Sequence, residues 1–178
     1  MSDLAAPYML PAELVGQGVI GFFLESRLFG IPIRLVREIN QHLDVTPVRM
    51  ASPFVRGLIN LRGQVVTVLD LGAKFSFGRR TIGEKSRLII LKTNAELAEL
   101  RSYTRTCDEC VALLVDRISD VLQPDPADLE RPPPNLDDAG TAHIAWVYKI
   151  PRSAMSVLAP ATFLTHEDEL TVPCDATD

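Results

Sequence analysis

Two residue types in this chain could carry chemistry near neutral pH, namely three cysteines and three histidines. Cys107 and Cys110 have the spacing that lets two thiolates bind one zinc ion. A structural zinc site needs four ligands, and no second pair with metal-binding spacing is present, so His143 or Cys174 could complete a site only through the fold. A strand-like run at 111–115 follows directly, which favours ordinary thiols at the start of a strand. A small metal-binding or redox protein that uses Cys107 and Cys110 remains the alternative hypothesis.

Catalytic patterns are absent from the sequence. The histidines at 42, 143 and 166 lie in no pattern with a serine or cysteine nucleophile. The chain contains no G-x-S-x-G, no P-loop and no dinucleotide-binding G-x-G-x-x-G sequence. We therefore expect neither an enzyme nor a bound cofactor.

The composition is that of a globular protein, with 47% apolar and 23% charged residues in a chain of 178. No apolar run is long enough to span a bilayer, and the first residues lack the pattern of a signal peptide, so a cytoplasmic location without membrane insertion is expected. The net charge of −5 conceals an asymmetry, because residues 27–105 carry a net charge of +8 and the remainder −13. The basic segment is either a contact face or a set of separate solvated surfaces. It lacks the aromatic spacing of a stacking platform, which argues against a nucleic-acid partner.

The elements that must position any site are short. Strands are expected at 19–24, 28–33, 35–39, 65–69, 87–92, 111–115, 118–122 and 142–150. Ser52-Pro53 predicts the start of a brief helix over 54–59, Asp70 predicts the cap of another over 71–75, and 155–164 predicts a closing helix. Such closely spaced strands favour an all-β barrel or sandwich over an α/β fold.

The domain organisation is expected to comprise three parts. Residues 1–18 are predicted to be a loosely held arm, 19–164 a domain of two small barrels with a boundary near residue 80, and 165–178 an acidic tail. A basic connector at 79–85 suggests that boundary. The segment from Gln123 to Asp138 contains five prolines and is predicted to be an extended loop.

Residues 54–71 carry a family resemblance. The run Phe54-Val55-Arg56-Gly57-Leu58-Ile59-Asn60-Leu61-Arg62-Gly63, followed by a β-branched run and Leu69-Asp70-Leu71, resembles the central motif of CheW-type chemotaxis coupling proteins. Val36-Arg37-Glu38-Ile39 is similar to the V-x-E-I stretch of that family. The likeness covers roughly residues 19–164.

This resemblance implies an all-β fold of two interlocked SH3-like five-stranded barrels with a few short helices. It also implies a non-catalytic chemosensory adaptor without a cofactor. Members of the family link the regulatory domain of a CheA-type histidine kinase to the cytoplasmic tips of chemoreceptors. By resemblance the protein is expected in the cytoplasm, recruited to membrane-associated receptor arrays. A regulatory barrel that binds other partners is a third hypothesis.

By resemblance, four residues are implied in partner binding: Val36, Glu38, Gly57 and Arg62. Physically, Val36 would be an apolar anchor, Glu38 an orienting charge, and Gly57 a point where a partner backbone approaches closely. Arg62 would either contact the partner or donate to backbone carbonyls around its turn, whereas Asn60 and Gly63 are expected to form that turn. The stretch 93–110 looks longer than the usual family connection and Pro160 interrupts the closing helix, so the particular chemosensory pathway stays open.

Overall fold

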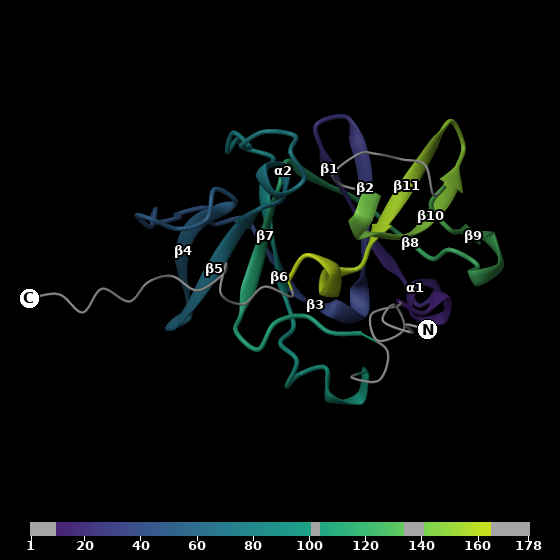
Figure 1. The fold of residues 1–178 in the computed structure, drawn as a ribbon, viewed down its shortest axis with the longest axis horizontal. Helices are drawn as coiled ribbons and strands as arrows, with labels where there is room; N and C mark the ends of the chain where they lie inside the picture. The colour runs from purple at the N-terminus through teal and green to yellow at the C-terminus, as the bar shows by residue number, and fades with distance from the viewer. Residues whose placement is uncertain (1–9, 101–103, 134–140, 165–178) are drawn as a thin grey trace, which may run out of the picture.

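The protein is represented by a computed structural model, which describes residues 10–100, 104–133 and 141–164. Strands dominate these residues and form two sheets that lie side by side (Figure 1). The six-stranded sheet has the order β8-β1-β2-β11-β10-β9, with β1 Val19–Leu24, β2 Arg27–Pro32, β8 Arg117–Leu122, β9 Leu129–Glu130, β10 Ile144–Ile150 and β11 Ser153–Leu158. The five-stranded sheet has the order β3-β6-β7-β5-β4, with β3 Val36–Asn40, β4 Val55–Leu61, β5 Gln64–Asp70, β6 Arg87–Leu91 and β7 Val111–Val115. The predicted all-β class is confirmed.

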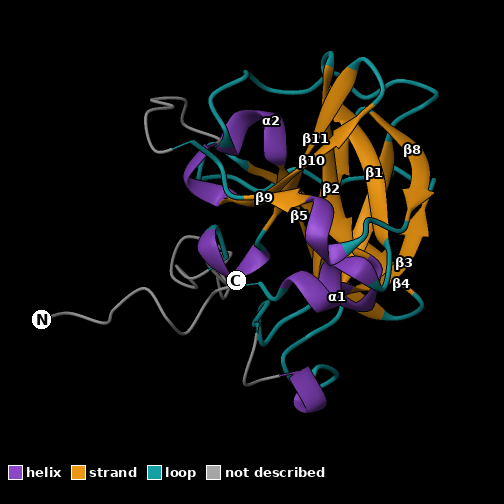
Figure 2. Cartoon of the chain, turned by 90° about the vertical axis from the view of Figure 1, so that its right-hand side faces the viewer, coloured by secondary structure: helices purple, strands orange, loops and turns teal. Residues whose placement is uncertain are grey.

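The helices are short and lie around the strands (Figure 2). They are α1 Ala12–Gly16 and α2 Leu71–Lys74, with the 3-10 turns η2 Ile33–Leu35, η3 Ala98–Leu100, η4 Pro126–Asp128, η5 Thr141–His143 and η6 Pro160–Thr162. No helix among the described residues combines the length and the apolar character needed to cross a membrane.

The two sheets are interlocked through the path of the chain. Figure 1 shows purple N-terminal strands beside green and yellow C-terminal strands in the six-stranded sheet, whereas the middle of the chain builds the other sheet. The expected boundary near residue 80 is therefore wrong, because the connector at 79–85 joins α2 to β6 within the five-stranded half. The chain instead changes sheets at η2 and again at Asp116, between β7 and β8.

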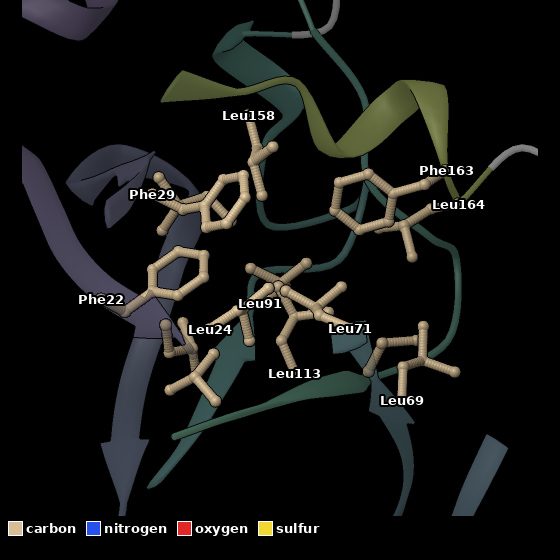
Figure 3. Packing of buried hydrophobic residues seen from close by; sticks show 14 of the residues in the cluster. Phe22, Leu24, Phe29, Leu69, Leu71, Leu91, Leu113, Leu158, Phe163 and Leu164 are labelled. Atoms are coloured by element: carbon tan, nitrogen blue, oxygen red, sulfur yellow. The ribbon is translucent and has the colours of Figure 1, made fainter. Parts of the chain in front are cut away.

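A shared hydrophobic cluster joins the sheets. It contains Phe22 and Phe29 from the six-stranded sheet and Leu91 and Leu113 from the five-stranded sheet, and Figure 3 shows these side chains facing a common centre. Each sheet also has a cluster of its own. Along β7 the side chains alternate between the shared cluster and the cluster of the five-stranded sheet, so this strand is buried on both faces. This double burial explains why its sequence is a continuous apolar run.

Two predicted helices are strands. Over 54–59 the chain forms β4, whose backbone pairs with β5, and Ser52 accepts a turn hydrogen bond from the Val55 amide without capping a helix. Burial of Val55, Gly57 and Ile59 follows a period of two, a pattern that the apolar residues at 54, 55, 58 and 59 also allow. Over 155–164, β11 occupies the first part, and only the 3-10 turn η6 follows.

The described part of the N-terminal segment is packed, so the prediction of a loose arm is wrong there. Leu10, Leu14 and Val15 are buried in the cluster of the six-stranded sheet. The indole Nε1 of Trp146 also donates to the Leu10 carbonyl at 2.8 Å. The predicted tail at 165–178 lies outside the described residues, as does part of the proline-rich loop, whose described portion contains η4 and β9.

Asp70 fixes the end of β5 and the start of α2, as its sequence position predicted. Its fully buried carboxylate accepts from the amide of Ala73 at 3.0 Å and from the amide of Arg80 at 2.7 Å. The Arg56 guanidinium lies 3.7 Å from the same carboxylate. One side chain thus joins β4, α2 and the connector at 79–85.

Replacing Asp70 with alanine is expected to lower the free energy of unfolding by about 3 kcal/mol, because two amides and one guanidinium lose a buried acceptor. Urea denaturation followed by circular dichroism measures the change. The exposed Asp120 offers a control, and Asp120→Ala should change stability by no more than about 0.5 kcal/mol. Equal stability of the two variants would contradict the role given to Asp70.

Candidate partner-binding surface

The Asn-Leu-Arg-Gly sequence forms the tight turn between β4 and β5. Leu61 pairs with Gln64, and the two intervening residues both have positive φ, 54° for Arg62 and 85° for Gly63. This is the geometry of a type I′ hairpin, which suits the twist of the strands. The Gly63 amide donates to Asn60 Oδ1 at 2.8 Å. The prediction that Asn60 and Gly63 form the turn is confirmed.

Glu38 and Arg62 meet across the surface. Arg62 Nη1 lies 3.0 Å from Glu38 Oε2, although β3 and β4 are opposite edges of the sheet. The Arg62 side chain is 80% exposed and that of Glu38 is 24% exposed. Because exposed ion pairs contribute at most about 1 kcal/mol, this pair costs little to open. Arg62 therefore presents a guanidinium that can exchange its carboxylate partner.

Val36 does not lie on the surface as an apolar anchor. It pairs with Leu91 and its side chain joins the shared cluster, where it supports β3 from inside. Exposed apolar side chains on neighbouring positions are instead Ile33 and Ile39, together with Val65 on β5. Sequence patterning missed them because a bulge between residues 36 and 38 breaks the alternation along β3.

Gly57 is approached closely by the chain itself. Its φ is +150°, and a Cβ at this position would overlap the carbonyl of Thr46. The segment after β3 returns to β4 here, and Thr46 and Leu58 exchange two backbone hydrogen bonds of 2.8 Å. The close approach that was expected of a partner backbone is thus made within the protein, and it brings the two edges of the sheet together.

A recess of about 420 Å³ lies next to the hairpin turn. Its walls are the segment after β3 and the end of β4, and the residues that line it are Asn40, His42, Asp44, Ile59, Asn60, Leu61 and Arg62. The recess gives the surface around Arg62 a concave shape with polar and apolar walls.

Arg37 lies between the two β3 residues of the predicted site and makes four contacts. It donates to Glu96 through Nε at 3.0 Å and Nη2 at 2.6 Å, and through Nη1 to Gln64 Oε1 at 3.1 Å and Cys110 Sγ at 3.2 Å. The hydrogen bond from Arg37 holds the pKa of Glu96 below its ordinary value. The same bond raises the pKa of Arg37, so both groups stay ionised as a pair.

The cysteines do not form a common site. Cys107 belongs to the shared cluster and its thiol donates to the Leu164 carbonyl, whereas Cys110 belongs to the cluster of the five-stranded sheet. Burial raises the pKa of the Cys110 thiol. His143 stacks on Phe75, and Cys174 lies outside the described residues. Within the described ranges no three His, Cys, Asp or Glu side chains are placed to hold a metal ion, so nothing supports the metal-binding alternative.

The fold and this surface define a two-sheet β protein with an exposed, mixed polar and apolar site suited to binding other proteins. The CheW-like domain family matches residues 18–168. The chain belongs to this family, and it is a coupling adaptor of the chemotaxis type.

Individual relatives agree with that assignment. The chemotaxis protein CheW of Klebsiella aerogenes is 32% identical over 122 residues, which cover 68% of this chain and 66% of that protein. The CheW of Bacillus subtilis is 24% identical over 159 residues, covering 89% and 94% respectively. The crystal structure of the scaffolding protein TtCheW from Thermoanaerobacter tengcongensis superimposes with a TM-score of 0.66 at 26% identity, covering 79% of this chain and 82% of that one.

Gly57→Ala is expected to lower the free energy of unfolding by about 2 kcal/mol, because the new Cβ meets the Thr46 carbonyl and the φ is unfavourable. Gly83, which has open space around it, is the matched control, and Gly83→Ala should leave stability within about 0.5 kcal/mol. Thermal unfolding of both variants measures the difference. A Gly57→Ala protein as stable as wild type, but unable to bind partners, would restore a contact role for Gly57.

Removing the Arg37 guanidinium is expected to raise the pKa of Glu96 toward its ordinary value of 4.5. Because the folded-state pKa of Glu96 lies below its unfolded value, the pair stabilises the fold above about pH 4.5, and this stabilisation is lost as the pH falls through the folded-state pKa. NMR titration of the glutamate carboxyl carbons in wild type and Arg37→Gln measures the shift. An unchanged Glu96 titration in the variant would show that Arg37 is not its main partner.

Proposed function

We propose that this protein couples the cytoplasmic tips of chemoreceptors to the regulatory domain of a CheA-type histidine kinase. The observation that carries the proposal is the hairpin tip, on which Arg62 is exposed and held only by Glu38 at the surface. Membership of the CheW-like family supports the same role. The adaptor would bind proteins through surface contacts and would itself catalyse nothing.

The surroundings of the tip fit protein recognition. Ile39 follows Glu38 directly and Val65 lies three residues after Arg62, and both are exposed large apolar side chains. A charge that fixes orientation beside an apolar contact is typical of protein interfaces. The five-stranded sheet is built from the basic part of the chain, so we expect acidic partner surfaces and an association that weakens with salt.

The unit that performs this role is assigned to residues 19–164, flanked by an N-terminal segment at 1–18 and an acidic segment at 165–178. The proposed location is the cytoplasmic side of membrane-associated receptor arrays. The relatives include protein FrzA of Myxococcus xanthus, 29% identical over 118 residues, which cover 66% of this chain and 65% of that protein. Family membership alone therefore does not choose between flagellar chemotaxis and another chemosensory pathway.

Arg62→Ala is expected to weaken binding to at least one of the two partners by about tenfold, because a charged contact at an interface is lost. Stability should change by less than about 1 kcal/mol, since the Glu38 ion pair is exposed. Isothermal titration of the purified protein with the kinase regulatory domain, and separately with a receptor cytoplasmic domain from the same organism, measures the affinities.

The control for this experiment is Arg79→Ala, which removes another exposed arginine from the same basic part of the chain. It should bind both partners as wild type does. If the folded wild-type protein binds neither domain, the proposed function is wrong. If it binds the kinase domain alone, the protein is a regulatory barrel that acts without receptors.

A further inference from the structure

Two consecutive residues of β3 contact the two sides of the hairpin turn. Glu38 reaches Arg62 at 3.0 Å, and Arg37 reaches Gln64 at 3.1 Å. Between these two contact points on the hairpin lies only Gly63. The bulge between residues 36 and 38 interrupts regular pairing at Arg37, and such bulges re-aim the side chain of the inserted residue. The hairpin tip is thus tied to β3 at two points.

The two ties differ in strength. The Glu38–Arg62 pair is a single contact with an arginine that is 80% exposed, and any partner that engages either charge competes with it. Arg37 is only 25% exposed, bonds Glu96 through two nitrogens, and also contacts Gln64 and Cys110. A guanidinium held in this fork geometry loses less freedom per hydrogen bond than a monodentate group. The Arg37 tie therefore persists when the Glu38–Arg62 pair opens.

Glu96 brings a third segment to the same point. Its Oε2 accepts from the Thr93 amide at 2.7 Å and from the Thr93 hydroxyl at 3.1 Å, so the carboxylate is already oriented toward Arg37. The next residue, Leu97, is buried in the cluster of the six-stranded sheet beside α1. The connector between β6 and β7, residues 92–110, is therefore anchored at one side by the core and at the other by Arg37.

We propose that Arg37 is a positioning residue of the partner-binding surface, which holds the hairpin tip against β3 and couples the connector at 92–110 to that tip. The inference rests on the proposed function for its link to partners, but the tie itself is a property of the free protein. It gives the long connector, for which the sequence suggested no role, a mechanical effect on the placement of Arg62. A molecule that moved the connector would loosen the tip through Glu96 and Arg37.

The first experiment needs no partner. Amide hydrogen exchange of the full chain is measured by NMR for wild type, Arg37→Gln and Glu96→Gln. Exchange at Gly63 and Gln64 is expected to accelerate by about fivefold or more in both variants, while amides of the β10–β11 hairpin keep their wild-type rates. Arg34→Gln is the matched control, because Arg34 precedes β3 and donates to Gln17 instead of to the hairpin. Unchanged exchange at the tip in both variants overturns the proposal.

A charge swap separates the pairing from a general effect of substitution. Arg37→Glu and Glu96→Arg should each accelerate exchange at the tip, and the double variant should restore slower exchange because a carboxylate and a guanidinium again face each other. If the double variant exchanges at least as fast as the faster single variant, the ion pair is not what holds the tip.

The second experiment tests the link to partners. Arg37→Gln is expected to weaken binding of the kinase regulatory domain or of the receptor cytoplasmic domain by about fivefold, although Arg62 and Glu38 are intact. A loosened tip with wild-type affinity for both domains would overturn the positioning role. If wild type binds neither domain, the proposed function fails, while the exchange measurements still decide whether Arg37 and Glu96 hold the tip.

Discussion

The structure depends on strands that are buried on both faces at the junction of the two sheets. In β6, Leu88 faces the cluster of the five-stranded sheet and Ile89 faces the shared cluster, and in β7 Ala112 and Leu113 divide in the same way. Such strands have no face left for water or for a partner. Each sheet would expose a wide apolar face without the other, because the shared cluster draws its side chains from both. Contact with other proteins is therefore left to the edges of the sheets and to the turns.

The edge strands β3 and β4 show what this constraint does to the candidate surface. Each carries an irregularity at an arginine, Arg37 in β3 and Arg56 in β4, where the register shifts by one residue. At both places the arginine reaches a carboxylate, Glu96 at the surface and Asp70 in the interior. The two edges are then joined by the Thr46 bridge, which is possible because β4 has a glycine opposite it. The surface around Arg62 is thus fixed by contacts on both sides of a closed path.

Local sequence patterns predicted the strands and the Asp70 cap well because these depend on neighbouring residues. The pairing of strands is not local, so the sequence could not show that the N-terminal hairpin pairs with strands from the C-terminal third, and the boundary near residue 80 was misplaced. The helix expected over 54–59 failed for the same reason, since pairing with β5 decided between two periodicities that the residues allow. Of the four candidate residues, the structure joins Glu38 and Arg62 but buries Val36 and packs Gly57 against Thr46. The resemblance located the region, and only the tertiary contacts separate exposed side chains from buried ones.

The positive charge of residues 27–105 overstates what a partner meets. Arg37 and Arg56 are paired with Glu96 and Asp70, and Arg80 spans from Glu25 to Asp116 across the junction of the sheets, so three cations of the segment serve the fold itself. Attraction over distances beyond about 10 Å is also screened at physiological salt. What distinguishes Arg62 is therefore its geometry and not the net charge around it. It stands on a turn whose backbone needs no help from its side chain, opposite a carboxylate that it can leave at little cost.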